Sequence, residues 1–332
     1  MDIINTLPEE ERVEVMVRKR AGDSPKKVKK RWTRDDTELT LLAAPTVVWY
    51  VLFSFLPMFG IIIAFKEFKI QGNFIESVFS SPWCGLENFR FMFASQDAWI
   101  VLRNTLGYNI VFIILGIVVP VTLALLIGQL HNKRAAKVYQ TMMFMPYFLS
   151  WVVVAAVVWG FLSFDKGLVN TALAGFGGEP VNWYMVKGPW PYLLIFLNLW
   201  KGVGYGMVVY LATITGIDST YYEAAVIDGA TKWQQVRYIT LPMMKTVIVI
   251  MFIMAVGRIF YSDFGLFYQV PHDSNSLHSV TYTIDVMVYK MLTSATTGMA
   301  SAAAFFQSTM GCVTILLANW VVRRIDPDSA LI

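Results

Sequence analysis

The residues with the most distinctive spacing lie between Asp218 and Pro242, in a polar segment that separates two long apolar runs. Small residues in this segment permit another backbone to approach closely, and the carboxylates beside them accept hydrogen bonds from basic or amide donors. This chemistry favours docking of a macromolecule over bond breaking. The residues that would carry it are Glu223, Ala224, Ala225, Asp228, Gly229 and Ala230, followed by Leu241 and Pro242.

Two other interpretations of this segment are an amphipathic helix that lies on the lipid surface and a plain connector. A helix that binds the lipid surface favours Lys and Arg on its polar face. The first half of the segment is acidic instead, with Glu223 and Asp228. That composition weakens the lipid interpretation and leaves docking and connection as the alternatives.

Capping signals predict the local structure of the segment. Thr220 and Glu223 have capping-box spacing, so a helix should begin at Tyr221. Gly229 suits the left-handed residue that ends a helix. Thr231 and Gln234 repeat the capping-box spacing, which predicts a second short helix before Pro242, a residue that fits the first turn of the next helix. The segment should therefore form a helix–glycine–helix elbow.

Two basic residues, Lys201 and Arg258, interrupt apolar runs, and a charge within a membrane span is costly unless it is paired or hydrated. In one interpretation Arg258 pairs with Asp263, and Lys201 extends its ammonium group to the interface. In the other, one or both face a cavity and meet an acidic sugar. If the path is cationic in this way, Lys201→Ala should impair uptake of a uronate far more than uptake of a neutral sugar. The candidate path comprises Asn198, Lys201, Tyr205, Arg258, Tyr261, Asp263 and Gln307.

The sequence argues against an enzyme. The three histidines, His131, His272 and His278, lack the spacing of a zinc protease, and there is no Gly-x-Ser-x-Gly nucleophile motif. No Gly-Lys dipeptide occurs, which excludes a Walker-type phosphate loop. We therefore expect no catalytic residue, no metal site and no cofactor on this chain. A secondary transporter, the weaker alternative, would want an intramembrane carboxylate or a broken helix pair at the midplane. Asp263 and Asp285 lie near the edges of predicted spans, and the sequence has no row of acids.

The elements that position these residues are six apolar runs in a chain of 332 residues that is 56% hydrophobic and 15% charged. A soluble protein carries roughly a quarter charged residues, and about 20 apolar residues cross a bilayer as a helix. The sequence predicts an all-α polytopic membrane protein. Its spans are roughly Leu41–Phe65, Thr105–Gln129, Thr141–Ser163, Trp190–Gly216, Pro242–Phe264 and Ala302–Val322.

Basic residues gather on one side of these spans: 18 of the 27 Lys and Arg residues fall in the N-terminal tail, two loops and the C-terminal end. The positive-inside rule makes that side cytoplasmic, including both termini. We expect one transmembrane domain over residues 41–322, between a basic tail of residues 1–40 and a short tail of residues 323–332. The basic cluster Lys26–Arg34 reads as a topology signal beside anionic lipid. On the other side, Phe74–Phe93 suits a segment on the membrane surface, and Asn275–Thr297 is an exposed, re-entrant or cap element.

The docking segment also resembles a known motif. Glu223-Ala224-Ala225, Asp228-Gly229-Ala230, Ile239 and Leu241-Pro242 are similar to the EAA motif of the permeases of ABC importers. The chain departs from that pattern at Val236, where the family usually has Phe, and at Thr246, where it often has Pro. Residues 85–90 and 258–271 resemble the permeases for oligosaccharides and polysaccharides, including the alginate-importer type. The resemblance covers nearly everything after Leu41.

The resemblance implies a MetI-like permease core in a bacterial inner membrane. It implies pairing with a second, similar permease and docking of two ATPase subunits, which hold ATP and Mg, at the EAA segments. A binding protein outside the membrane would deliver the solute. The implied solute is an oligosaccharide, acidic and alginate-like, with import of a different solute as the alternative. The elbow at residues 218–242 would then act as a rigid lever that drives alternating access, without a nucleic-acid partner.

Overall fold

The computed structural model describes residues 33–94, 96–294, 297–327 and 330, and in these ranges the chain is helical and contains no strand. The basic cluster predicted at Lys26–Arg34 falls outside the described residues except for its last member. The chain divides into two compact units, one ending at Phe59 and one beginning at Gly60. The expected all-α class is confirmed.

The first unit contains α2 (Arg34–Tyr50) and η2 (Val51–Phe55), and the helical path continues in η3 (Leu56–Phe65). Thr33 and Asp36 form a capping box that starts α2. The apolar stretch therefore belongs to a helix that begins at Arg34, seven residues before the predicted start at Leu41. The side chains of Leu41, Leu42 and Trp49 are exposed, as expected of a span whose surface faces lipid.

The second unit begins with two short helices and continues through four long spans, with short elements between them. Its elements are α3 (Phe74–Ser80), α4 (Glu87–Ala94), α5 (Gln96–Gly128), α6 (Lys133–Phe144), η4 (Met145–Phe148), α7 (Trp151–Leu162), α8 (Leu168–Gly175), α9 (Trp190–Thr215), α10 (Ser219–Ile227), α11 (Lys232–Gln235), η5 (Val236–Thr240), α12 (Leu241–Val256), η6 (Gly265–Gln269), η7 (Asn275–Leu277), α13 (His278–Thr281), α14 (Ile284–Thr293) and α15 (Thr297–Ile325). Five helices of the described chain are long and apolar enough to span a membrane, and a bent helix pair brings the number to six.

The bent pair is where the predicted span Thr141–Ser163 differs from a single helix. The helices Lys133–Phe148 and Trp151–Leu162 meet at 97°. Pro146 lies at the start of η4, and the Ser150 side chain accepts a hydrogen bond from the Val153 amide as the N-cap of α7. Proline fits the first turn of a helix, and an N-cap serine accepts a hydrogen bond from an amide of the first turn. Pro146 and Ser150 therefore favour a break in the span followed by a new helix.

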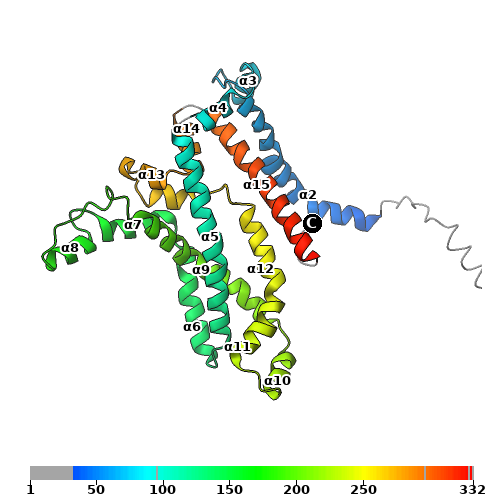
Figure 1. Cartoon of the computed structure of the whole chain (residues 1–332). Helices are drawn as coiled ribbons and strands as arrows, with labels where there is room; N and C mark the ends of the chain where they lie inside the picture. Colours follow the sequence, from blue (N-terminus) through cyan, green and yellow to red (C-terminus); the bar gives the residue numbers. More distant parts are fainter. Residues whose placement is uncertain (1–32, 95, 295–296, 328–329, 331–332) are drawn as a thin grey trace, which may run out of the picture. The chain divides into compact units, whose positions relative to one another are not determined.

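Helices α5 and α9 pack side by side and form the centre of the second unit (Figure 1). Small residues allow close approach in this region, as is usual between membrane helices. Gly204 of α9 lies against the backbone of Met143 and Phe144, where any side chain would collide. The buried side chains of Met207 and Tyr210 in α9 pack with Met244 of α12. This packing holds α9 and α12 together, and both helices contribute residues to the wall of a cavity.

The segment Phe74–Phe93, predicted to lie on the membrane surface, forms α3 and most of α4. The Lys66 side chain is buried, and its ammonium group donates to the carbonyls of Val78 and Phe79 at 2.6 and 3.3 Å, at the end of α3. Phe79 and Trp83 remain exposed. The structure thus ties the segment to the end of the first span while leaving an apolar face free, which is compatible with the predicted surface position.

Candidate functional site

A cavity of about 730 Å³ lies between α5, α9, α12 and the irregular segment that follows α12. Its polar wall contains five of the seven residues predicted for the candidate path: Asn198, Tyr205, Arg258, Tyr261 and Asp263. Apolar residues of α5, including Phe112 and Ile113, line the other side. The volume is in the range of sites for small solutes, and the polar groups that converge on one wall suit a hydrophilic one.

The polar wall is held in place by Asn109 of α5. Its amide group donates to the carbonyls of Ile259 and Tyr261 at 2.9 and 2.8 Å. Helix α12 ends at Val256, earlier than the predicted boundary at Phe264, so these carbonyls have no partner inside a regular helix. Asn109 supplies that partner and thereby fixes the turn that presents Arg258 and Tyr261. Asn109 was not predicted as a site residue, although a polar amide within an apolar span is a recognisable signal in a sequence.

Arg258 and Asp263 both line the cavity, but no ion pair joins them among the described residues. The Asp263 carboxylate accepts a hydrogen bond from Trp151 Nε1 at 2.6 Å and from the backbone amides of Gly265 and Leu266 at 3.0 and 3.4 Å. These donors stabilise its negative charge. Arg258 is exposed in the cavity wall, and its guanidinium group forms no ion pair within the described part of the chain. The guanidinium group of Arg258 therefore gives the cavity wall a positive charge that a solute can contact.

Lys201 and Gln307 lie outside the residues that line the cavity. The Lys201 ammonium group donates to the Tyr147 carbonyl at 3.0 Å and lies about 5 Å from the ring centroids of Tyr147 and Trp151 (5.4 and 5.3 Å). The Tyr147 ring in turn stacks on Tyr205 of the cavity wall. Lys201 thus contacts the bent pair outside the cavity lining. A carbonyl and two aromatic faces stabilise its positive charge there.

Gln307 of α15 is buried, and its amide group donates to the Phe260 carbonyl at 2.9 Å and to Asp285 at 3.1 Å. Asp285 also accepts hydrogen bonds from the amide and hydroxyl groups of Ser262 at 2.6 and 2.8 Å. This network anchors the segment after α12 to α14 and α15. Asp285 was not predicted as a site residue, because its function as an anchor depends on partners that only the fold brings together.

The elbow at residues 218–242 is the second candidate site, and it has the predicted helix–glycine–helix form. Its first helix, α10, begins at Ser219, two residues before the predicted start. Asp218 is the N-cap instead of Thr220, because its carboxylate accepts from the Thr220 amide at 3.0 Å. The same hydrogen bond lowers the pKa of Asp218. Gly229 has a φ of +77°, and Thr231 and Gln234 form the predicted capping box.

Interactions between the two halves of the elbow make it rigid. The Tyr222 hydroxyl of α10 and the Thr240 hydroxyl of η5 are 2.9 Å apart. The buried Gln235 side chain donates to the Ala230 carbonyl at 3.2 Å. Tyr222, Gln235 and Thr240 were not predicted, since their partners lie across the turn. The elbow should move as one body.

The outer surface of the elbow is open. Glu223, Ala224, Asp228 and Gly229 are exposed, and Ala225 and Ala230 are half-buried. Ile227 and Trp233 are 86% and 69% exposed beside them. Large apolar side chains that flank carboxylates on a rigid surface are typical of a protein interface. The continuous chain through Leu241 and Pro242 leads from this surface into α12, whose other end borders the cavity.

Comparison with known proteins identifies the family. Residues 116–327 match the family described as "Binding-protein-dependent transport system inner membrane component". The chain belongs to this family of permeases. The match covers the elbow, most of the cavity wall and all spans from the middle of α5 onward, so the predicted membrane permease of an ABC importer is confirmed.

Relatives and solved structures agree with this assignment. The permease is 31% identical over 291 residues to the polygalacturonan/rhamnogalacturonan transport system permease protein YteP of Bacillus subtilis (strain 168), covering 87% of this chain and 89% of the relative. It is 30% identical over 295 residues to the protein LplB of the same organism, with coverage of 88% and 91%. The structure of a bacterial alginate ABC transporter, in complex with alginate pentasaccharide-bound periplasmic protein, matches with a TM-score of 0.79. The identity is 30%, and the match covers 90% of this chain and 98% of that one.

Family membership also decides between two transport classes. The bent pair α6–η4 and α7 is a broken helix beside the cavity, which the sequence did not reveal. Broken helices at a substrate site are common in secondary transporters. Here the family and the matched structures belong to binding-protein-dependent and ABC transport systems. The chain is therefore a multi-pass inner-membrane permease of an ABC importer for sugars or oligosaccharides.

Proposed function

We propose that this permease forms part of the translocation path for an acidic oligosaccharide and that Arg258 meets the carboxylates of the passing sugar. The exposed, unpaired guanidinium group of Arg258 in the cavity wall carries this proposal. A guanidinium group binds a carboxylate through two parallel hydrogen bonds. Asn198, Tyr205 and Tyr261 would contribute hydrogen bonds and ring faces to the neutral parts of the sugar.

Two of the compared proteins support an acidic solute. One is the polygalacturonan/rhamnogalacturonan permease, and the other is the transporter for the acidic polysaccharide alginate. A lactose permease of Rhizobium radiobacter is also similar, at 27% identity over 246 residues. Import of another solute is therefore the competing proposal. A comparison of an acidic sugar with a neutral one distinguishes the two proposals.

The elbow would receive an ATPase subunit at Glu223, Ala224, Asp228 and Gly229, with ATP and Mg bound by that partner. A second permease of the same family would complete the path. The alginate transporter structure contains a periplasmic protein loaded with alginate pentasaccharide, which supports delivery of the solute by such a protein to the face opposite the elbow. Both termini would then lie in the cytoplasm with the elbow.

Transport would follow from the rigid connection between these parts. ATP binding draws the two ATPases together, and each carries its elbow with it. Because Leu241 continues directly into α12, displacement of the elbow moves the wall that contains Met251, Ala255 and Arg258. The cavity then opens alternately to the two sides, driven by the different affinities of the ATPases for nucleotide in the two states.

The test is uptake into proteoliposomes that contain the full importer, its ATPase and its binding protein. Tetragalacturonate is compared with the carboxyl-reduced tetrasaccharide of the same linkage. Arg258→Gln should lower the uptake rate of the acidic sugar about tenfold, the factor that corresponds to one charge-assisted hydrogen bond, and should change neutral uptake little. Arg258→Lys is the matched control: it keeps the charge but loses the second hydrogen bond, so its uptake of the acidic sugar should lie between wild type and Arg258→Gln. Equal losses for both sugars would refute the proposal that Arg258 selects for charge.

A further inference from the structure

Three aromatic rings form a cluster at one side of the cavity, and this cluster has no assigned function. Phe264, which lines the cavity, stacks on Tyr268 with ring centroids 4.8 Å apart and planes 16° apart. Tyr289 of α14 lies 4.7 and 5.0 Å from these two rings. The Tyr289 side chain is 39% exposed. Part of this aromatic triad is therefore open to solvent.

The triad lies beside the half of α5 that is remote from the elbow. Its helix α14 begins where the Ile284 amide donates to the Thr105 hydroxyl near the start of α5. Leu125 and Leu126, near the other end of α5, border an apolar crevice with Trp233 and Val236 of the elbow. About 20 residues of helix separate the two places, which is roughly 30 Å. The triad thus lies on the side of the cavity away from the elbow, which is the delivering side in the proposed orientation.

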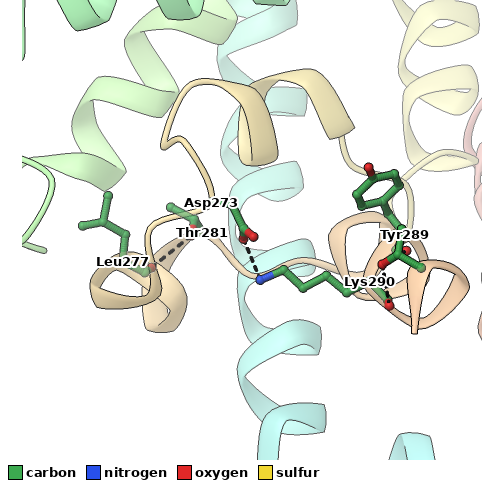
Figure 2. Close-up of polar contacts among 6 residues, drawn as sticks. Asp273, Leu277, Thr281, Tyr289 and Lys290 are labelled. Carbon is green, nitrogen blue, oxygen red and sulfur yellow. Dashed lines mark hydrogen bonds and ion pairs between the residues drawn. The ribbon is translucent and has the colours of Figure 1, made fainter. Parts of the chain in front are cut away.

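A charged pair stands next to the triad. The side chain of Lys290 extends from α14 to Asp273, with 2.6 Å between Nζ and Oδ1 (Figure 2). The same ammonium group lies 5.6 Å from the centroid of the Tyr282 ring. Asp273 belongs to the turn after η6, because its amide donates to the Tyr268 carbonyl at 3.2 Å. The pair therefore connects the two elements that carry Tyr268 and Tyr289.

The pair is accessible to competing ions. The side chains of Lys290 and Asp273 are 31% and 41% exposed, and ion pairs in contact with water contribute little net stability. A carboxylate on a solute could replace Asp273 at small cost. The neighbouring ring faces offer an apolar surface for the C–H groups of a sugar, and the tyrosine hydroxyls offer hydrogen bonds.

We propose that the aromatic triad and Lys290 form an entrance subsite that holds a uronate residue of the oligosaccharide before it reaches Arg258. The rings carry the sugar face, and Lys290 exchanges the Asp273 carboxylate for that of the uronate. This inference rests on the proposed acidic substrate. It adds a second cationic group, so the carboxylates of successive sugar residues meet Lys290 first and Arg258 next.

Two substitutions in the ion pair give opposite expected results. The probe is tetragalacturonate, and its binding to the full importer in nanodiscs is followed by saturation-transfer NMR, which detects weak binding. Lys290→Met should raise the Kd of the acidic probe about tenfold and leave the Kd of the carboxyl-reduced probe unchanged. Asp273→Asn should lower the Kd of the acidic probe severalfold, because it frees Lys290. Asn tolerates the left-handed backbone at this position (φ +47°).

A structural strut would behave differently. If the pair only fastened the turn to α14, both substitutions would weaken binding in the same direction and would affect both probes, which would overturn the proposal. Tyr289→Leu should weaken binding of both probes, whereas the matched variant Tyr289→Phe should retain binding of both. If wild-type importer takes up no tetragalacturonate, the proposed function fails. If uptake occurs and depends on Arg258, but the Lys290 and Asp273 variants bind like wild type, the subsite alone is refuted.

Discussion

At the scale of single residues, the two basic groups inside the membrane have different surroundings. Arg258 lines the cavity without an ion pair among the described residues, whereas Lys201 donates to the Tyr147 carbonyl and faces two rings. The sequence left substrate contact and structural satisfaction open for both residues, because spacing alone cannot tell which side of a helix faces a cavity. The Tyr147 carbonyl that Lys201 binds lies in η4, at the break in the third span, and the break was not predicted.

We predict that Lys201→Met destabilises the permease by about 1–2 kcal/mol, the cost of leaving a carbonyl and its surroundings without their charged donor. It should reduce uptake of acidic and neutral tetrasaccharides by the same factor, in contrast to Arg258→Gln. Thermal unfolding in detergent and uptake by proteoliposomes measure the two effects. Lys201→Arg, which keeps a donor and a charge, should be close to wild type. A selective loss of acidic uptake in Lys201→Met would instead place Lys201 in the path.

At the scale of elements, the elbow was the part best predicted from sequence. Gly229, Thr231 and Gln234 are local signals, because each acts on backbone groups within a few residues. The residues that join its two halves were missed, since the contact between Tyr222 and Thr240 spans 18 residues. The same reason explains the cavity: Asn109 and the carbonyl of Tyr261 are 152 residues apart. Local sequence rules therefore predicted the elbow, whereas long-range contacts determine the cavity wall that the elbow is proposed to move.

Backbone changes at the elbow should uncouple the ATPase from transport. Gly229→Pro cannot adopt the φ of +77° found there, because proline fixes φ near −65°. We expect loss of sugar-stimulated ATPase activity and uptake, with unchanged helical content by circular dichroism. Gly229→Asn is the matched control, since Asn tolerates this conformation, and it should retain coupling. Normal sugar-stimulated ATPase activity in Gly229→Pro would count against a rigid lever.

The exposed carboxylate of Glu223 tests the docking surface separately from its backbone. Glu223→Lys should weaken co-purification with the ATPase and lower stimulated ATPase activity severalfold, whereas Glu223→Asp should have a smaller effect. The side chain is exposed, so reversal of its charge should leave the thermal stability of the permease itself unchanged. A large loss of stability in Glu223→Lys would mean that the residue supports the fold of the elbow instead of the partner.

At the scale of the whole molecule, the second unit has one end that carries the elbow and another that carries the aromatic triad. An ion pair of 2.8 Å between Lys245 of α12 and Asp326 after α15 brings the C-terminal end of α15 to the elbow end of α12. The six spans predicted from hydropathy correspond to five candidate membrane helices of the described residues and to the bent pair in the third position. The proposed direction in the membrane rests on the positive-inside rule, which predicts that the side with 18 of the 27 basic residues, including those of the elbow, is cytoplasmic.

This orientation predicts which positions a membrane-impermeant maleimide can reach in intact spheroplasts. After Cys84 and Cys312 are replaced by Ser, a single reporter is introduced by Gln234→Cys in the elbow or by Asn275→Cys in the segment before α13, both at exposed positions. The Asn275→Cys reporter should be labelled in intact spheroplasts, and the Gln234→Cys reporter only after the membrane is permeabilised. The reverse pattern would place the elbow outside the cell, where no ATPase could meet Glu223 and Asp228, and would refute the proposed coupling together with the direction of transport. Labelling of both reporters only after permeabilisation would show that the entrance subsite does not face the delivering side.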